Sequence, residues 1–397
     1  MQLDPQRHIL GVLAGAGEYP RLVIEGARRA GVRVVCAGFR GAVGREIPPL
    51  CDAFKRFRVG AVEAPTRFFA EQGVTHVLMA GQIKPACIYT MWPDATARRL
   101  LAQLQRRNAH TLFGAVCRYG AEQGWQVLPS TTFMEPYMPG VGHIAGPLAS
   151  PEQLEEARHG LVLAREIARL DIGQSLVVHG RQAVCVEAFK GTNECLREGG
   201  GRPYATTLCK VTKPGHDMRF DVPCIGLDTI RHCVRFNVRH IVIEAGRTIL
   251  FQREKVAALC AQHGITLHAL EVPEEGVLLP ELPPTDSDAA HARALARAMA
   301  RLGVGCSAVV CDGVVIAVED TEGPFKCLRR AGAYMRRLRL VRLVNWLVRL
   351  LLGIPSAPPA PMVMALAPGV EPLPELCRAA RRAGVQLLSA ASGDSSR

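Results

Sequence analysis

Short apolar runs alternate with glycine-containing or polar loops along most of the chain. In the first part, these runs predict strands at 9–14, 32–39, 76–85 and 125–130, and a helix at about 19–30. The first strand runs into the loop Gly15-Ala16-Gly17 before that helix. A strand, a glycine loop, a helix and a second strand are typical of a doubly wound nucleotide-binding domain. We therefore expect an α/β protein with a Rossmann-like domain over residues 1–146.

Two loops at the carboxyl ends of these strands are candidate ligand-binding segments. Gly15 and Gly17 precede a helix N-terminus, where backbone N–H groups favour a phosphate. Gly81, Gln82 and Lys84 follow the third strand, and ligands of open α/β sheets bind at this edge. Proline replaces the third glycine of a dinucleotide fingerprint, and no acid follows the second strand. Both departures argue against a nicotinamide-dependent enzyme.

A second domain is expected over residues 150–272. A Pro- and Gly-rich stretch at 134–151 resembles a linker, and Ser150-Pro151-Glu152 is a typical helix start. Beyond that helix the pattern predicts a hairpin, a helix from about 228, a buried strand at 240–247, a helix at 253–263 and a last strand. The mixture of a hairpin with strand–helix units predicts a mixed α/β domain.

The stretch KPGHDMRFDVPCIG, residues 213–226, concentrates charged side chains among apolar ones. Asp217, Arg219 and Asp221 alternate, so an extended chain would place them on one face. Two carboxylates suit a hard divalent cation, while Lys213 and Arg219 suit the oxygens of a phosphate that the cation binds. The pattern predicts a metal-assisted phosphate site, with a solvated edge strand as the alternative.

The composition is that of a folded protein: of 397 residues, 48% are hydrophobic and 21% are charged. The 14 cysteines form no CxxC pair and no signal-peptide pattern opens the chain, so we expect reduced thiols in the cytoplasm. The net charge of +12 favours anionic partners. Only 5% of the residues are aromatic and no aromatic stacking motif of an RNA-binding module is found, which argues against a nucleic-acid partner.

Six short motifs occur in the order and spacing of one known family. They are GVLAGAGEYP at the first loop, AGQIKP at the third strand, LDIGQ (170–174), VEAFKGT (186–192), KPGHDMRFDVPCIG and EAG (244–246). Over residues 7–272 the chain resembles LpxI-type UDP-2,3-diacylglucosamine pyrophosphatases. The resemblance implies a two-domain, metal-dependent hydrolase of lipid A biosynthesis. It would cleave the diphosphate of UDP-2,3-diacylglucosamine to UMP and 2,3-diacylglucosamine 1-phosphate.

The resemblance implies that one aspartate is essential, and the chemistry of the neighbouring side chains suggests further roles. The essential aspartate of the family falls on Asp221, which would ligate Mg²⁺ or Mn²⁺ or orient the attacking water. Asp217, as a second metal ligand, and Arg219 would assist it in a cleft between the two domains. Further contacts with the UDP-linked glycolipid would come from Lys213, Gln174 and Thr192. Turn and cap roles are an equal alternative for the last two.

Acidic positions of the family are replaced in this chain. Lys190-Gly191-Thr192-Asn193 stands where the family usually has Glu-Gly-Thr-Asp, and Arg107-Asn108-Ala109-His110 where it commonly has Gly-Asp-Asp. Asn193 and His110 could act as neutral ligands. If the missing acids are required, the chain would be a non-catalytic protein that binds a nucleotide sugar or a lipid. That is the alternative to an enzyme.

The last third of the chain carries an internal repeat. Beyond a Pro- and acid-rich linker at 273–287, residues 303–332 align without gaps on residues 171–200. Pro324 replaces the loop threonine, and nothing like KPGHDMRFD follows. We therefore expect residues 288–397 to be a degenerate copy of the catalytic domain with a structural or dimer-like packing role. A homodimer of the whole chain stays open.

A basic amphipathic stretch, Tyr334–Gly353, lies inside that copy. Arginines alternate there with leucine, valine and tryptophan. Such a helix could lie on an anionic membrane, which would suit a lipid substrate and the inner face of the inner membrane. Covering the core of the copy is an equally good interpretation. No apolar run is long enough to span a membrane.

Overall fold

The chain folds into two compact units in a computed structural model. The structure describes residues 3–83, 91–104, 109–215, 218–220, 222–272, 279–280, 282, 285–351 and 361–388; for 109–110, 337–342, 344–345 and 347–351 it describes the backbone only. Unit 1 comprises residues 1–137 and 217–222, and unit 2 comprises residues 138–216 and 223–397. The first boundary therefore precedes the expected one at 146, and part of the KPGHDMRFD motif belongs to unit 1.

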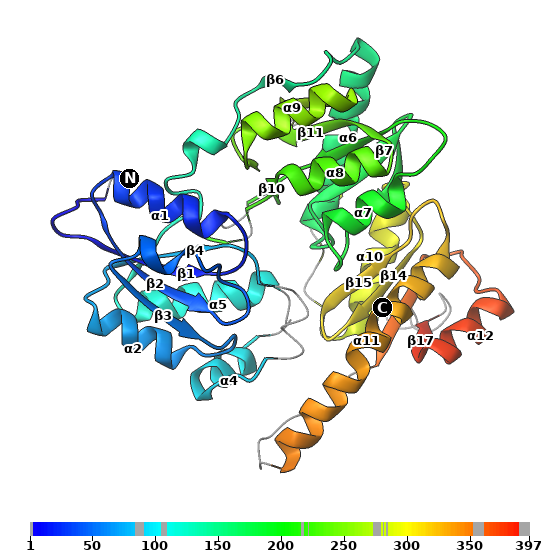
Figure 1. Cartoon of the computed structure of the whole chain (residues 1–397). Coiled ribbons are helices and arrows are strands. Elements are labelled where there is room, and N and C mark those ends of the chain that lie inside the picture. Colours follow the sequence, from blue (N-terminus) through cyan, green and yellow to red (C-terminus); the bar gives the residue numbers. More distant parts are fainter. Residues whose placement is uncertain are drawn as a thin grey trace. The chain divides into compact units, whose positions relative to one another are not determined.

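Unit 1 is built on a five-stranded parallel sheet (Figure 1). Its strands are β1 (Ile9–Ala14), β2 (Arg33–Phe39), β3 (Ala53–Phe57), β4 (His76–Ala80) and β5 (Gln126–Val127), in the order β3-β2-β1-β4-β5. Its described helices are α1 (Tyr19–Arg29), α2 (Glu63–Glu71), α4 (Ala95–Ala102) and α5 (Ala109–Glu122), with the short η1 (Pro48–Leu50) and η2 (Glu135–Tyr137). This order, with β1 central, is the predicted Rossmann-like arrangement.

Burial explains which strands the apolar pattern predicts. β1, β2 and β4 are almost continuously buried, as expected of parallel strands with helices on both faces. The pattern does not predict β3, because Lys55 and Arg56 interrupt its apolar residues. Both side chains are exposed, since β3 is an edge strand of the sheet.

A six-stranded sheet forms the first part of unit 2. Its strands are β6 (Gly142–Ala145), β7 (Ser175–His179), β8 (Gln182–Val186), β9 (Thr206–Lys210), β11 (Val238–Glu244) and β13 (Thr266–Leu270), in the order β6-β13-β11-β9-β7-β8. β10 (Cys224–Ile225) and β12 (Ile249–Leu250) form a separate parallel pair. The linker prediction for 134–151 is wrong in part, because β6 pairs antiparallel with β13. A short glycine-containing strand is tolerated there because it lies at the sheet edge.

Helices cover both faces of this sheet. α6 (Pro151–Arg169) packs on one face, and α7 (Thr192–Gly199), α8 (Leu227–Arg235) and α9 (Arg253–His263) pack on the other. α6 begins as predicted: Ser150 Oγ accepts from the Gln153 N–H, and the Gln153 side chain accepts from the Ser150 N–H. This capping box satisfies two donors of the first turn.

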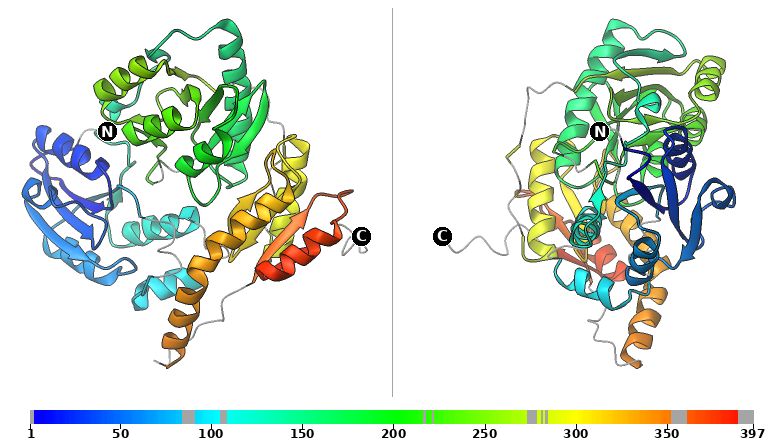
Figure 2. Two further views of the ribbon diagram at one scale, coloured as in Figure 1. Left: turned by 45° about the vertical axis from the view of Figure 1, so that its right-hand side comes forward. Right: turned by 90° about the vertical axis from the view of Figure 1, so that its left-hand side faces the viewer.

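Four strands form a further sheet in the C-terminal part of unit 2 (Figure 2). β14 (Ser307–Cys311), β15 (Val314–Val318), β16 (Met362–Leu366) and β17 (Val385–Leu388) lie in the order β15-β14-β16-β17. α10 (Asp288–Arg301) packs on one face, and α11 (Pro324–Leu351) and α12 (Pro374–Ala383) pack on the other. One hydrophobic cluster contains buried residues of both α6 and α10, so the two parts of unit 2 share a core.

Part of residues 288–388 (the second segment) repeats part of residues 150–272 (the first segment). The end of α10, the strands β14 and β15 and the start of α11 lie 132 residues beyond the end of α6, the strands β7 and β8 and the start of α7. β16, α12 and β17 do not keep this spacing. β14 and β15 have the bounds of β7 and β8, and α11 starts at the position that matches the start of α7. The hairpin turns match as well, since Gly180, Arg181, Asp312 and Gly313 all have positive φ. Two successive positive-φ residues are typical of a type I′ hairpin turn.

α11 is the longest of the described helices. Cys327, Leu328, Ala331 and Met335 bury its N-terminal half against the further sheet. The C-terminal half extends past that sheet (Figure 1). No helix in the described part of the chain has the length and the apolar composition that crossing a bilayer requires.

Candidate functional site

The loops after β1 and β4 meet at the carboxyl edge of the unit 1 sheet. Ala16 and Gln82 form a β-bridge with N···O distances of 2.8 and 2.9 Å. A Cβ on Gly15 would lie 2.7 Å from the Gln82 carbonyl oxygen. A Cβ on Gly81 would lie 2.7 Å from the Ala16 carbonyl oxygen. The two candidate ligand loops are therefore adjacent, and both glycines are needed for this close approach.

Gly17 has different surroundings. Its φ is +94°, and an added Cβ would meet none of the described atoms within 4 Å. The positive φ favours glycine, and the open space allows a ligand atom to approach the backbone. Gly17 is therefore the glycine of this edge whose surroundings fit a ligand contact. Lys84 lies outside the described residues.

Ser130 holds part of the KPGHDMRFD motif against the same edge. It is 2% exposed, and its Oγ lies 2.7 Å from the carbonyl oxygens of Met79, in β4, and of Arg219. The Ser130 N–H donates to the Met218 carbonyl at 2.6 Å. The Tyr19 hydroxyl donates to the Ser130 carbonyl at 2.7 Å. One buried serine thus ties the motif to the sheet.

Phe220 is a second anchor of this segment. It is buried, and its ring centroid lies 5.8 Å from that of Phe113 in α5. Residues 218–220 form a turn and a bend rather than a strand. The expectation of an extended chain at Arg219 is therefore wrong, because these residues are held by Ser130 and Phe113 and not by a strand ladder. Asp217 and Asp221 lie outside the described residues.

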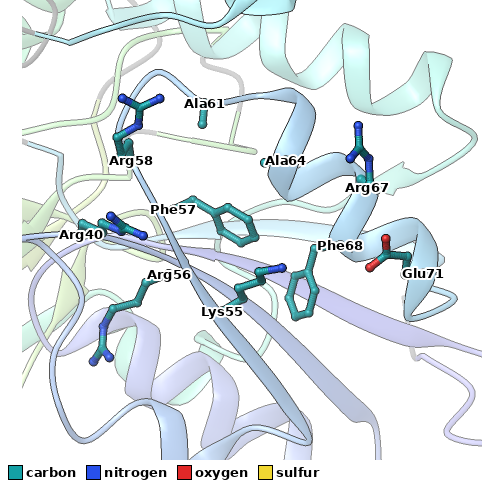
Figure 3. Close-up of a pocket in the computed structure, with 10 residues that line it drawn as sticks. All are labelled: Arg40, Lys55, Arg56, Phe57, Arg58, Ala61, Ala64, Arg67, Phe68 and Glu71. Atoms are coloured by element: carbon teal, nitrogen blue, oxygen red, sulfur yellow. The ribbon is translucent and has the colours of Figure 1, made fainter.

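A basic cavity of about 330 Å³ lies beside β3 in unit 1 (Figure 3). Arg40 follows β2 and Arg58 follows β3, and the Arg40 N–H donates to the last carbonyl of β3 at 2.8 Å. Lys55 and Arg67 also line the cavity, with Glu71 as the acid of its wall. None of these four cations pairs with a described carboxylate. The sequence pattern missed this cavity because its cations come from separate elements.

A polar network occupies the carboxyl end of β9 in unit 2. Lys210 is 5% exposed, and its Nζ donates to Ser175 Oγ at 2.9 Å and to Thr192 Oγ1 at 2.8 Å. Thr192 Oγ1 donates to Glu187 Oε1 at 3.1 Å, and Glu187 Oε2 lies 3.8 Å from Lys210 Nζ. A buried charge requires a partner, so Lys210 and Glu187 stabilise one another. The hydroxyl of Thr192 is committed to this Lys210 network (Ser175, Glu187, Thr192 and Lys210).

Other motif residues meet near the Lys210 network. Lys213 Nζ donates to Asp171 Oδ1 at 2.6 Å, so a phosphate at Lys213 would share or displace that carboxylate. The backbone carbonyl of Gln174 accepts from the first N–H after β9. Glu244 of the EAG motif accepts from the Thr212 N–H at 2.6 Å. The structure therefore brings together LDIGQ, VEAFKGT, EAG and the first residues of KPGHDMRFD.

Two residues, Asn193 and His110, stand where the family usually has acids, and the structure describes the side chain of Asn193 only. Asn193 Nδ2 donates to Asp228 Oδ2 at 2.6 Å, which links the start of α7 to the start of α8. Asn193 therefore has a structural partner where the family has an acid. The side chain of His110 lies outside the described residues.

One group of the described residues has metal-ligand spacing: Cys185, Glu198 and Asp320, whose ligand atoms lie within 4.8 Å of one another. Arg330 donates to both carboxylates, so a guanidinium already supplies positive charge. A hydrogen bond with Cys195 and burial raise the pKa of the Cys185 thiol. A neutral thiol and ion-paired acids do not suit Mg²⁺, which prefers free oxygen ligands. This group is not the predicted metal site.

These features define the class: an α/β protein with a Rossmann-like sheet followed by a mixed α/β domain. The LpxI N-terminal domain model matches residues 9–137. The LpxI C-terminal domain model matches residues 140–268 and 275–345. The chain belongs to the LpxI family.

A relative from Caulobacter vibrioides (strain ATCC 19089 / CIP 103742 / CB 15), UDP-2,3-diacylglucosamine pyrophosphatase LpxI, is 29% identical over 270 residues. The match covers 64% of this chain and 95% of that protein. About a third of this chain therefore lies outside that match.

Solved structures with partial likeness include two biotin carboxylases. The biotin carboxylase domain of a single-chain bacterial carboxylase has a TM-score of 0.20 and 14% identity, over 38% of this chain and 33% of that chain. The biotin carboxylase subunit of pyruvate carboxylase has a TM-score of 0.19 and 14% identity, over 46% of this chain and 38% of that chain. At such TM-scores the likeness carries no argument about function.

Proposed function

We propose that this protein hydrolyses the diphosphate of UDP-2,3-diacylglucosamine to UMP and 2,3-diacylglucosamine 1-phosphate in lipid A biosynthesis. Membership of the LpxI family and the relative that carries the pyrophosphatase name support the proposal. The structural observation that carries it is the anchoring of Met218 and Arg219 by Ser130 beside the glycine loops of unit 1. This anchoring keeps Met218 and Arg219 at the edge where open α/β sheets bind ligands.

In this proposal Asp221 and Asp217 hold a Mg²⁺ or Mn²⁺ ion. Two carboxylates in one short segment are a donor set that hard divalent cations prefer. The bound metal would offset the charge of the diphosphate and activate a water. Arg219 shares this segment, and its guanidinium suits a phosphate oxygen.

The basic cavity supports an anionic substrate. Arg40, Lys55, Arg58 and Arg67 belong to the same unit as the glycine loops, and Arg40 and Arg58 extend the carboxyl edge of its sheet. Like charges around one hollow repel one another, and binding a polyvalent anion relieves that repulsion. We assign this cavity to an anionic part of the substrate, with Gly17, Gly81 and Gln82 contacting it further along the edge.

The Lys210 network positions the VEAFKGT loop. Lys210 donates to the hydroxyls of both Ser175 and Thr192, so it fixes the start of α7 against β7. We assign Lys210 and Thr192 a positioning role rather than a substrate contact. Lys213 and Gln174 remain our candidates for contact with the substrate.

The second segment is, in our proposal, a copy of the first that has lost the chemistry. The equal spacing of matching strands and turns supports a common origin. Position 324 is proline where the first segment has Thr192, and no motif of acids and cations precedes β16. Hydrolysis would therefore depend on unit 1 and the first segment.

The exposed part of α11 is a candidate contact with an anionic lipid surface. Its C-terminal half extends past the sheet that α11 covers, and Leu343 there is 43% exposed. Basic amphipathic helices bind such surfaces through an apolar face and flanking cations. Docking there would bring the enzyme to its lipid substrate at the inner face of the inner membrane.

Release of UMP from UDP-2,3-diacylglucosamine, measured with Mg²⁺, Mn²⁺ or a chelator, tests the proposal. We expect release that requires the metal. The alternative, a binding protein on an enzyme fold, is favoured by Asn193, whose amide is bonded to Asp228 where the family has an acid. Tight binding of the substrate without release at any metal concentration would establish that alternative.

A further inference from the structure

The two segments of unit 2 present matching edge strands to one another. β8 ends the first sheet and β15 begins the further one, and these strands match in the two segments. Thr321 Oγ1, just after β15, donates to the Val184 carbonyl on β8 at 3.2 Å. One carbonyl of the β8 edge is thus bonded to the other segment and not left open to a foreign strand.

One pair of matching positions takes part in two contacts between the segments. The rings of Phe189 and Tyr334 lie 5.0 Å apart, and Arg202 Nη2 donates to Thr321 Oγ1 at 3.5 Å. Phe189 and Thr321 are matching positions, 132 residues apart in the two segments. The first contact therefore uses Phe189, and the second uses its match, Thr321.

Glu198 and Arg330 lie where a two-fold axis would pass. They are matching positions, 132 residues apart, and Arg330 Nη1 donates to Glu198 Oε2 at 3.0 Å. When equivalent residues of two copies contact one another, they lie close to a two-fold axis, as in an isologous dimer. Repeats related by translation, as in a solenoid, contact their neighbours through different faces. The segments are therefore related by a pseudo-two-fold rotation.

The shared core has the same symmetry. The buried face of α6 and that of α10 enter one cluster through matching residues. These are Leu163, Ala164 and Ile167 in α6, and Leu295, Ala296 and Met299 in α10. Each segment thus offers the same helix face to the common core, as two subunits of a homodimer do.

We propose that the second segment occupies the place of a second subunit. The first segment has a self-complementary face made of the edge of β8, the start of α7 and the apolar side of α6, and this chain covers that face in cis. The partner that fits this face is another LpxI-type C-terminal domain. The second match to that domain, at residues 275–345, falls on the second segment.

The charges of Glu198 and Arg330 at the pseudo-two-fold axis favour pairing with the second segment over pairing with a second copy of the first segment. Two first segments would bring Glu198 against a second Glu198. Here Arg330 takes that place and binds Glu198 and Asp320 together. Like charges at an axis disfavour a homodimer, and an opposite charge favours the internal pairing.

Cleavage of the intact protein tests the proposal first. A specific protease site is inserted after Val272, and the folded protein is cut there. We expect the two fragments to stay together with the mass of the uncut protein in light scattering, and Arg330→Glu to weaken their association about tenfold or more. Fragments that separate completely at micromolar concentration would overturn the proposal.

A chain that ends at Val272 tests the face itself. The match to the Caulobacter vibrioides relative covers 95% of that protein but only 64% of this chain. The family therefore includes shorter proteins of this kind. We expect the shortened chain to dimerise in sedimentation, and Glu198→Gln to tighten the dimer about fivefold or more by removing like charges at the axis. Glu194→Gln is the matched control, since Glu194 pairs with Lys190 and Arg197 in its own segment.

Monomers of both the shortened chain and its Glu198→Gln variant would contradict the proposal. If the shortened chain does not fold, the cleaved protein still tests the proposal, because both segments fold before the chain is cut.

Discussion

Two matching sites in unit 2 differ in one buried cation. In the first segment, Lys210 lies opposite Ser175 in the β7–β9 ladder and donates to it at 2.9 Å. In the second segment, Leu366 lies opposite Ser307 in the β14–β16 ladder. The second segment forms the same strand pairing with a leucine in place of the lysine, so a cation at this position is not required for the sheet to form.

The acid beside the cation shows the consequence. Glu187 lies 3.8 Å from Lys210 Nζ. Glu319 is the matching acid of the second segment, and Leu366 stands there in place of a lysine. Burial raises the pKa of Glu319. Its carboxylate accepts a hydrogen bond from the Cys306 N–H at 3.1 Å. A buried carboxylate stays charged most readily where a cation is supplied. The charged network thus belongs to the segment with the motifs of the family, and only its framework remains in the other.

The largest effect is expected from Lys210→Met, which gives the first segment an apolar residue like that of the second. Glu187 would lose its counter-charge while buried, which costs about 3–5 kcal/mol of the free energy of unfolding. UMP release should fall as well, because the VEAFKGT loop loses its anchor. Denaturant unfolding and kcat/KM measure the two effects. Leu366→Met is the matched control, and a Lys210→Met variant as stable and active as the wild type would break the comparison.

Arg330→Met should lower stability without lowering turnover. Burial lowers the pKa of Arg330, but the charges of Asp320 and Glu198 outweigh it and raise that pKa, so the residue is a fixed cation. Its removal leaves the buried Asp320 without its cation, while Glu198 keeps Arg197 at 3.2 Å, so we expect a cost of about 3 kcal/mol. Unfolding curves and kcat at a temperature where the variant is folded separate the two effects. A loss of kcat like that of Lys210→Met would show that the second segment takes part in the chemistry.

Substitutions in the basic cavity of unit 1 test substrate binding independently of the Lys210 network. Arg58→Glu with Arg67→Glu should raise KM for UDP-2,3-diacylglucosamine about tenfold and change kcat little, because two exposed cations near the anion become anions. Arg378→Glu with Arg381→Glu on α12 is the control with the same change in net charge. Equal KM values for the two variants would rule out a specific role for the cavity.

The smallest effect concerns pH. Burial raises the pKa of Glu319 above its value in the unfolded chain. Its contribution to stability is therefore fully present below the ordinary glutamate pKa and is lost as the pH rises through the folded pKa. Glu319→Gln should lack that loss, so its stability relative to the wild type should rise as the pH rises above the ordinary glutamate pKa. Thermal unfolding across this range measures it, and parallel curves would contradict the assignment.

Elements with strong local signals could be predicted from the sequence. β1 at Ile9–Ala14 and α9 at Arg253–His263 have the expected bounds, because apolar periodicity and flanking glycines define them. The start of α6 followed from Ser150 and Pro151. Bends and sheet edges could not be predicted in this way, as β3, β6 and residues 218–220 show, because their conformation depends on partners distant in the sequence.

The candidate site was predictable only where a motif carried it. Lys210 bonds to residues 35 and 18 positions away, and Ser130 lies 89 positions from Arg219, so no local pattern links them. Nothing in the sequence around Lys210 marks it as buried, since a lysine at a strand end is usually solvated. Such contacts follow from the strand order, which the sequence does not state.

The most direct test of the account is UMP release from UDP-2,3-diacylglucosamine by the wild type, Asp221→Asn and Glu319→Gln with Mg²⁺ present. We predict that Asp221→Asn lowers kcat/KM about 100-fold or more with an unchanged circular dichroism spectrum, because in the proposed site the metal would lose a charged ligand. Glu319→Gln should release UMP at the wild-type rate. Equal turnover by Asp221→Asn and the wild type would contradict the proposed hydrolysis at this motif.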